Sequence, residues 1–406
     1  MSKNTKIITI VTSAVVVAGA GYYFWPSIAF NNIRYTSGTA VVAGASALQP
    51  ALDADTTTTP PAVEGMSYST MPVTHIKTPD TVKALYISSW VGGVAKYRDP
   101  VIKIVDDTEV NAVVLDIKDS TGRISFPVAD QELASYGSVE KRIADIRGLT
   151  AELHAKNIYI IGRIAVFQDA FMTKKKPEWA IKKVSDGSVW TDNKGLSFLD
   201  PANPEVYPYI ASIAKEAYSD GFDEINFDYI RYPSDGKIKD IDYHLADGKS
   251  RADNVEAFWK YISENVRTKE NIPTSADLFG LTTEATDDMG IGQVWERALP
   301  YFDFIDPMVY PSHYPSGYGN FTNPAEHPYE VISKSMAGAI AKTKAAGYDI
   351  QKIRPWLQDF NLGAVYTKEL VEDQIRASNE KGLYSWLMWD PKNKYTPSAF
   401  APETNQ

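Results

Sequence analysis

The sequence predicts an eight-stranded parallel (β/α)8 barrel, the TIM-barrel fold, preceded by an N-terminal transmembrane helix or signal segment and a flexible linker. After Val82, short apolar runs alternate with longer amphipathic segments, as in repeated strand and helix units of a parallel sheet. Eight such runs occupy roughly 315 residues, which is the size of one barrel domain. Polar residues gather at the C-terminal ends of the runs. A doubly wound open sheet is the alternative arrangement of the same units.

The predicted strands are the eight apolar runs, and the clearest helices lie between them. Glycines follow three of these helices, as expected where a chain leaves a helix with a positive φ, at Gly221, Gly347 and Gly382. The strands cover residues 82–89, 112–119, 158–167, 224–231, 274–279, 304–310, 353–358 and 383–389. The helices cover residues 139–156, 204–219, 254–268, 329–346 and 368–381.

Residues 1–34 are predicted to be a membrane anchor or a signal peptide. Two lysines precede an apolar stretch at 7–25, which approaches the roughly 20 residues that span a bilayer. Lysines before such a segment favour a cytoplasmic N-terminus, so the rest of the chain is expected outside the membrane. Ala18 and Ala20 also form a small-x-small cleavage site, and the protein would be secreted if the segment is removed there.

The barrel is expected to occupy residues 81–396, between two segments without periodic apolar residues. Residues 35–80 are rich in Ala, Thr, Ser and Pro, including the run TTTTPP at 56–61, which is typical of a linker. Residues 397–406 form a short C-terminal tail.

Composition excludes several classes of function. A net charge of −10 with no basic stripe argues against a nucleic-acid partner and disfavours anionic polymers as ligands. The chain has no cysteine, so it has neither disulfides nor thiolate metal sites. It also lacks the GxSxG, HExxH and phosphate-loop motifs, and the acidic segment at 284–288 lacks the ligand spacing of a calcium loop. We therefore expect no metal and no cofactor.

The polar residues at the strand ends form the candidate site, because barrel active sites are built at that face. Asp228 and Asp277 end neighbouring strands and are the predicted catalytic pair. A structural ion pair between Asp228 and Arg231 is the plainer interpretation of that carboxylate. Asp119 and Glu224 are further candidates for the second carboxylate, as is Asp116. The predicted substrate-binding residues are Asp116, Lys118, Arg163, Asn226, Arg231, Tyr310, His313, Trp356, Gln358 and Trp389.

Paired carboxylates of this kind are what glycoside hydrolysis requires. One protonated acid supplies a proton to the leaving oxygen, and one ionised carboxylate acts as nucleophile or activates water. Aromatic rings at strand ends can stack on sugar rings. The sequence leaves the separation of the two carboxylates open, and with it the choice between retention and inversion.

The segment from about residue 82 to 395 resembles a bacterial family of glycoside hydrolases with a barrel related to the α-amylase type. The motifs that carry the resemblance are VVLDIKD at 113–119, LDPANPEV at 199–206, FDEINFDYIRYP at 222–233, SADLFG at 275–280, DPMVYPSHY at 306–314, RPWLQDF at 354–360 and WLMWDP at 386–391. The resemblance implies that Asp228 is the nucleophile and Asp277 the acid. Amylase-type enzymes carry an arginine at the position of Asn226. A chitinase-type mechanism is disfavoured because its acid would fall on Ile230.

These observations predict a membrane-tethered glycosidase that acts outside the cytoplasmic membrane on a neutral or amino-sugar polysaccharide or oligosaccharide. The alternative is a catalytically silent carbohydrate-binding or cell-envelope structural protein on the same barrel.

Overall fold

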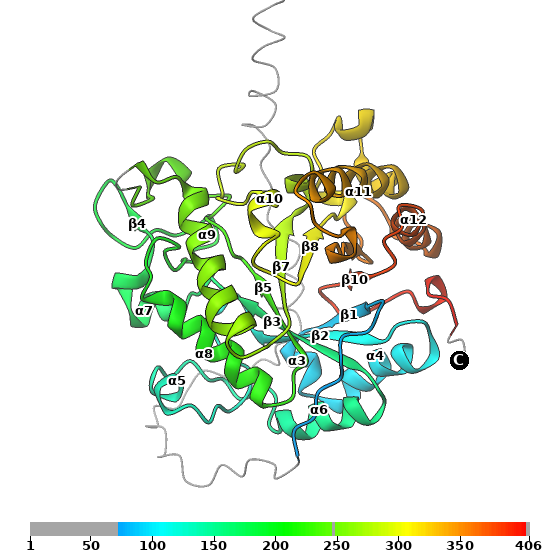
Figure 1. Ribbon diagram of the computed structural model, residues 1–406, viewed down its shortest axis with the longest axis horizontal. Coiled ribbons are helices and arrows are strands. Elements are labelled where there is room, and N and C mark those ends of the chain that lie inside the picture. The colour runs from blue at the N-terminus through cyan, green and yellow to red at the C-terminus, as the bar shows by residue number, and fades with distance from the viewer. Residues whose placement is uncertain (1–71, 246–247, 403–406) are drawn as a thin grey trace, which may run out of the picture. The chain divides into compact units, whose positions relative to one another are not determined.

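The computed structural model describes residues 72–245 and 248–402, and this part of the chain folds around a closed barrel of eight parallel strands (Figure 1). Around the barrel the strands follow the order β1-β10-β9-β8-β7-β5-β3-β2. They are β1 (Lys83–Ile87), β2 (Ala112–Lys118), β3 (Tyr159–Ala165), β5 (Glu224–Asp228), β7 (Thr274–Phe279), β8 (Phe304–Met308), β9 (Trp356–Gln358) and β10 (Trp386–Trp389). Each predicted strand is present, so the (β/α)8 prediction is confirmed and the open sheet is excluded.

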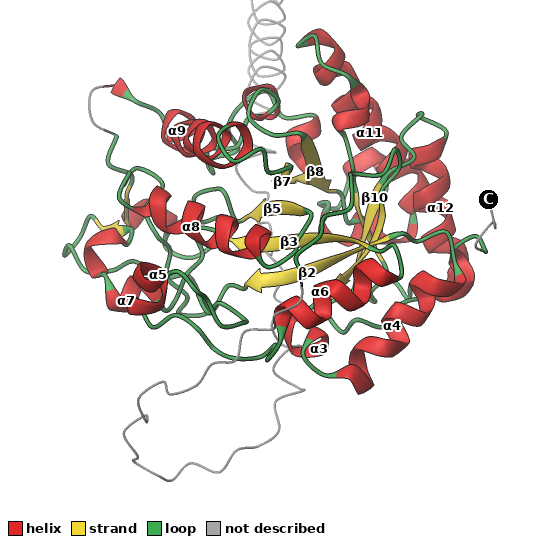
Figure 2. Cartoon of the chain, turned by 60° about the horizontal axis from the view of Figure 1, so that its bottom comes forward, coloured by secondary structure: helices red, strands yellow, loops and turns green. Residues whose placement is uncertain are grey.

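The main helices surround the strands, as Figure 2 shows. The helix predicted over 139–156 begins only at Ile146, because the Asp145 side chain caps it by accepting a hydrogen bond from the backbone N–H of Gly148. The helix at 95–107 was not among those predicted from sequence. The helices that cover the barrel are α4 (Ala95–Asp107), α6 (Ile146–Ala155), α8 (Val206–Ser219), α9 (Arg251–Ile262), α11 (Pro328–Ala345) and α12 (Lys368–Asn379).

Shorter elements lie in the loops between these units. The segment between β3 and α8 and the segment after β5 contribute one strand each to a small antiparallel pair, β4 (Lys182–Lys183) with β6 (Ile241–Asp242). A π-helical turn, Ser263–Thr268, extends α9 toward β7. The remaining short α-helices are α3 (Ser89–Gly92), α5 (Gln131–Ser135), α7 (Met172–Lys175) and α10 (Trp295–Ala298).

The residues on either side of the predicted barrel contact it. At the N-terminal end, the backbone N–H of Ile76 donates to Asp223 at 2.6 Å, and Thr78 bonds the hydroxyl of Tyr159 at 2.9 Å. At the other end, Phe400 stacks on Trp386 with ring centroids 5.6 Å apart. The last residues of the predicted linker and the first residues of the predicted tail therefore belong to the folded domain.

The predicted anchor and most of the predicted linker lie outside the described residues. In residues 72–245 and 248–402, no helix combines the length and the apolar character needed to cross a bilayer.

Candidate active site

Arg163 lies at the centre of the polar groups at the C-terminal end of the barrel. It projects from β3 and forms ion pairs with two carboxylates on the flanking strands. Its Nη1 donates to Asp116 Oδ1 at 2.6 Å, and its Nη2 and Nε donate to Asp228 Oδ2 at 2.5 and 3.1 Å. A third carboxylate, that of Asp277, has its Oδ2 4.0 Å from Nε. One buried guanidinium thus organises three carboxylates from three strands.

Asp228 is the last residue of β5 and pairs with Arg163, not with Arg231 as the plainer sequence interpretation had it. The reason is local: Tyr229 has a φ of 53°, a left-handed conformation that ends the strand and lets its backbone N–H donate to Asp228 Oδ1 at 2.6 Å. Non-glycine residues rarely adopt this conformation, and such strain is concentrated at functional sites. Asp228 is 5% exposed.

Two N–H donors hold the carboxyl group of Asp277 beside Arg163. Asn226 Nδ2 and Trp356 Nε1 both donate to its Oδ1, each at 2.8 Å. Burial raises the pKa of Asp277 well above its usual value, and the charges of Asp228 and Asp306 raise it further. This carboxyl group therefore favours its protonated form. Because Oδ1 already accepts two hydrogen bonds, the proton belongs on Oδ2.

The two predicted catalytic carboxylates are close enough to act on one sugar residue. Oδ2 of Asp228 and Oδ2 of Asp277 lie 3.1 and 4.0 Å from the same Arg163 Nε, so they are at most the sum of these distances, about 7 Å, apart. Separations of about 5 to 5.5 Å accompany retention and about 6.5 to 9.5 Å inversion. The upper limit of about 7 Å therefore permits the separation typical of retention and the shortest separations typical of inversion.

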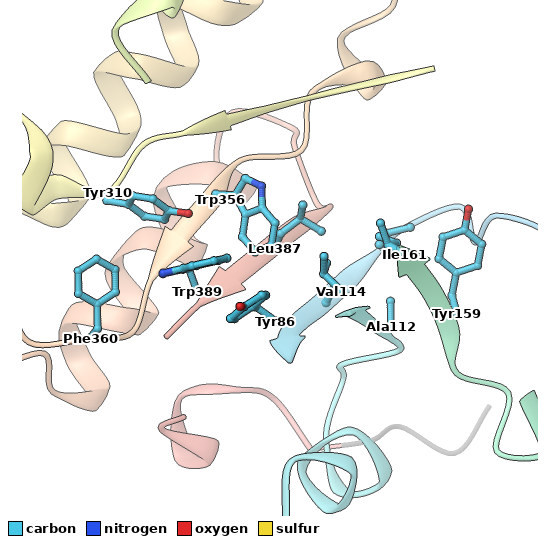
Figure 3. Packing of buried hydrophobic residues seen from close by; sticks show 12 residues of the cluster. Tyr86, Ala112, Val114, Tyr159, Ile161, Tyr310, Trp356, Phe360, Leu387 and Trp389 are labelled. Atoms are coloured by element: carbon cyan, nitrogen blue, oxygen red, sulfur yellow. The ribbon is translucent and has the colours of Figure 1, made fainter. Parts of the chain in front are cut away.

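Aromatic side chains enclose the charged groups. Trp389 stacks on Tyr86 with centroids 3.9 Å apart and meets Trp356 edge to face at 5.5 Å (Figure 3). The hydroxyl of Tyr86 donates to Asp116 Oδ2 at 2.6 Å. Tyr310 lies on the same side as Trp389 and packs edge to face on Phe360. These rings are at most 7% exposed, so they shield the charged groups from solvent and do not present an open surface for stacking on a sugar.

A second ionic ring lies one layer deeper in the barrel and accounts for Glu224. Arg354 donates to Glu224 at 2.5 and 3.1 Å and to Asp306 at 3.1 and 3.2 Å. Ser275 and Tyr159 also donate to Glu224. Glu224 is fully buried, and Arg354, Ser275 and Tyr159 already bond its carboxylate oxygens. The alternation of side chains along β5 separates the layers: Glu224 is two residues before Asn226 and four before Asp228.

Several predicted site residues have protein partners that occupy their polar groups. Lys118 is fully buried and pairs with Asp169 at 3.0 Å. Gln358 accepts from Ser312 Oγ at 2.9 Å and donates to the backbone of Phe360 at 2.8 Å, so its amide positions a loop. Burial lowers the pKa of His313 to about 4, which keeps the ring neutral near pH 7.

Two candidates lie apart from Arg163. Asp119 pairs with Arg142 at 2.6 Å instead. Arg231 follows β5 and packs over the ring of Phe279, where its Cζ is 4.4 Å from the ring centroid.

Sequence reasoning missed Tyr86, Asp306 and Arg354. Tyr86 is the last but one residue of β1, and the rule that the C-terminal residues of barrel strands face the site would have found it. Asp306 lies in the middle of β8 and Arg354 two residues before β9, so a search of strand ends does not select them, although they begin the motifs DPMVYPSHY and RPWLQDF. Among the residues that the structure describes, no group of three or more His, Cys, Asp or Glu is arranged to hold a metal ion.

Comparison with known proteins agrees with the barrel and its chemistry. Residues 84–395 match the model of a family described as "putative glycosyl hydrolase domain". A hypothetical protein from Ruminiclostridium thermocellum ATCC 27405 is 32% identical, with 51% of this chain and 98% of that chain covered and a TM-score of 0.43. No curated protein matches the chain.

Two solved structures of glycoside hydrolases share the fold. The glycoside hydrolase domain of PgaB (BpsB) from Bordetella bronchiseptica has a TM-score of 0.55 at 12% identity, covering 77% of this chain and 95% of that one. The alpha-L-fucosidase isoenzyme 2 from Paenibacillus thiaminolyticus has a TM-score of 0.53 at 13% identity, covering 79% of this chain and 47% of that one. At these identities the likeness supports the fold.

Proposed function

The chain belongs to the family described as "putative glycosyl hydrolase domain", and we propose that it hydrolyses a polysaccharide or oligosaccharide with Asp228 and Asp277 as its catalytic carboxylates. The observation that carries this proposal is the environment of the pair. Asp228 is bound to the guanidinium of Arg163 at 2.5 Å, whereas Asp277 is 4.0 Å from it and is held by neutral donors. One carboxyl group is bound to a cation, and burial raises the pKa of its neighbour.

Asp277 is the general acid. Its Oδ2 carries the proton and transfers it to the glycosidic oxygen as the bond to the leaving sugar breaks. Trp356 and Asn226 fix the carboxyl group by bonding Oδ1 alone, which leaves Oδ2 directed to the side of Arg163 and Asp228. The charge of Asp228, among the causes of the raised pKa of Asp277, keeps that proton in place before the reaction.

Asp228 is the nucleophile, or the base that removes a proton from the attacking water. The ion pair with Arg163 and the N–H of Tyr229 hold both its oxygens in a fixed orientation. Arg163 comes from β3 at the level of Asn226, its register partner on β5. The guanidinium that amylase-type enzymes place on the nucleophile's own strand is therefore supplied here by the neighbouring strand.

The site of action is outside the cytoplasmic membrane. The support for this placement is the apolar stretch at 7–25 after two lysines and the Thr- and Pro-rich residues that separate it from the barrel. Cleavage after that stretch would give a secreted enzyme. Fractionation of cells, followed by protease treatment of intact cells, tests this placement: a barrel that stays with the cytosol would contradict it.

Release of reducing sugar by the full-length chain from a panel of neutral and amino-sugar polysaccharides tests the catalytic proposal. Asp228→Asn and Asp277→Asn should each lower kcat by roughly a hundredfold or more, the range for loss of a general acid or base. Asp220→Asn is the matched control, because Asp220 is also buried but follows α8 at the opposite end of the barrel, where it pairs with Arg147. Unchanged turnover in both site variants would exclude this pair.

A catalytically silent carbohydrate-binding protein is the second candidate. It is favoured by one observation: Asp277 is only 1% exposed, so the acid meets little solvent in the unliganded barrel. Glycan binding that persists in Asp228→Asn and Asp277→Asn, with no turnover by the unaltered chain at any pH, would establish this function instead.

A further inference from the structure

Arg231 differs from the two other arginines of the barrel because it has no carboxylate partner. Arg163 and Arg354 each bind two carboxylates at 3.2 Å or less. Arg231 is as buried as they are, at 3% exposed. Its one hydrogen bond runs from Nη1 to the backbone oxygen of Tyr232 at 3.0 Å, and no carboxylate oxygen of the described residues lies within 4.0 Å of it.

Two aromatic rings lie against the guanidinium of Arg231. The guanidinium Cζ lies 5.0 Å from the ring centroid of Tyr229 and 4.4 Å from that of Phe279. The guanidinium nitrogens of Arg231 that have no hydrogen-bond partner keep some solvent-accessible surface. Asn226 Oδ1, in contrast, is fully buried and also has no partner. A buried charge without partners is costly, and proteins retain such a group where a ligand completes it.

The location connects these free donors to the proposed reaction. Arg231 follows the catalytic strand β5, three residues after Asp228. The charge of Asp228 acts on Arg231, and the charge of Arg231 acts in turn on Tyr229, the residue whose N–H holds Asp228. The guanidinium of Arg231 also lies over the ring of Tyr229, the neighbour of Asp228 in the chain, with its Cζ 5.0 Å from the ring centroid.

Acidic groups surround Arg231 without binding it. Asp228, Asp235 and Asp192 all act on its charge, although each lies beyond ion-pairing distance. The loop after β5 packs on the segment around Asp192: a Cβ added at Gly236 would lie 3.1 Å from the Asp192 Cα. The three carboxylates repel any further anion that approaches the guanidinium.

We propose that Arg231 determines the substrate class: its free donors bind two adjacent hydroxyl oxygens of an uncharged sugar, and the surrounding carboxylates exclude sugars that carry a carboxylate or sulfate there. The proposal rests on the proposed function of the same site. A planar guanidinium presents parallel N–H groups that match two neighbouring oxygens. Hydroxyl oxygens accept these bonds without adding the negative charge that the site already contains.

Calorimetric binding by the full-length chain tests this proposal independently of turnover. The probes are neutral glucan, mannan and galactan oligosaccharides and the corresponding oligouronates. We expect the wild type to bind at least one neutral series and none of the oligouronates. Arg231→Met should weaken that binding roughly tenfold to a hundredfold, the range for loss of hydrogen bonds from a charged donor, and Arg231→Lys should restore only part of it.

Thermal unfolding of the same variants separates a binding residue from a structural one. Arg231→Met should leave Tm unchanged or raise it, because it removes a buried charge that has no carboxylate partner. Arg354→Met should lower Tm, because it leaves Glu224 and Asp306 without their cation. Asp235→Asn should let an oligouronate bind measurably, since it removes one of the repelling charges.

Four results would overturn the proposal: preference of the wild type for oligouronates, binding of no probe at all, unchanged affinity in Arg231→Met, or a loss of Tm in that variant equal to that of Arg354→Met. Failure of the catalytic proposal has a different signature, since it abolishes turnover of bound neutral sugars and leaves these affinities intact.

Discussion

The two arginine-centred rings of the barrel predict different results for the same substitution. Arg163→Gln removes the cation shared by Asp116 and Asp228, and Arg354→Gln removes the one shared by Glu224 and Asp306. Each leaves two buried carboxylates without their arginine. Breaking a buried ion pair costs about 3 to 5 kcal/mol, and at roughly 2 °C per kcal/mol for a large domain each variant should lose about 6 to 10 °C in Tm.

Catalysis should distinguish the two variants. Arg163 contacts Asp228 and lowers the pKa of Asp277, so its loss releases the nucleophile and raises the pKa of the acid still further. We expect Arg163→Gln to lower kcat by roughly a hundredfold or more and to move the alkaline limb of the kcat/KM profile to higher pH. Arg354→Gln should keep kcat within about tenfold below its Tm, because neither Glu224 nor Asp306 takes part in the proposed reaction.

Differential scanning calorimetry gives the Tm values, and initial rates of reducing-sugar release between pH 4 and about 9 give the profiles. Equal losses of activity in the two variants would refute the separation of a catalytic ring from a structural ring. So would an alkaline limb in Arg163→Gln that coincides with that of the wild type.

The wild-type kcat/KM should fall as pH rises through the pKa of Asp277, since the acid must be protonated. The pH profile of kcat/KM tests this role, and a value that keeps rising through pH 9 would contradict it. Trp356→Phe removes one N–H donor from the Asp277 carboxylate and should shift that fall to higher pH in the same assay. Burial raises the pKa of Asp359 from 3.8 to about 7, so the folded state holds this proton more tightly than the unfolded state does. The free energy of unfolding should therefore decline by up to about 4 kcal/mol as the pH rises from 4 to 7. Asp359→Asn should flatten that decline in urea titrations, and an unchanged slope would exclude this carboxyl as its source. Gly162→Ala places a Cβ 2.3 Å from Ile117 Cδ1 inside the sheet and should lower stability by about 1 to 3 kcal/mol in the same titrations, with a neutral effect showing that β2 can shift.

Local sequence patterns located the strands well and the loop structure less well. The apolar runs fall on buried strands because strands of a parallel barrel are covered on both faces. The small pair β4 and β6 has only two residues in each strand, too few to show a period, and α4 contains Pro100, a residue that usually argues against a helix interior. The helix begins at Ile146 because Asp145 caps it, and a search for apolar periodicity does not detect a polar capping residue.

The order of residues within β5 also determined which acids belong together. Alternation put Glu224, Asn226 and Asp228 on one face, and the structure confirms that all three face the barrel interior, at successive depths. The sequence alone therefore restricted the catalytic candidates to a few residues at the strand ends.

Only the tertiary structure decided which charge each acid meets. Arg163 reaches Asp228 across 65 residues of chain, and Arg354 reaches Glu224 across 130. These pairs depend on the order and register of the strands around a closed barrel, which no short window of sequence contains. Arg231, only three residues from Asp228, is left without a carboxylate because Tyr229 turns the chain between them. The sequence determined the strands and the acids they carry, and barrel closure decided that Asp228 meets Arg163 and that Glu224 meets Arg354.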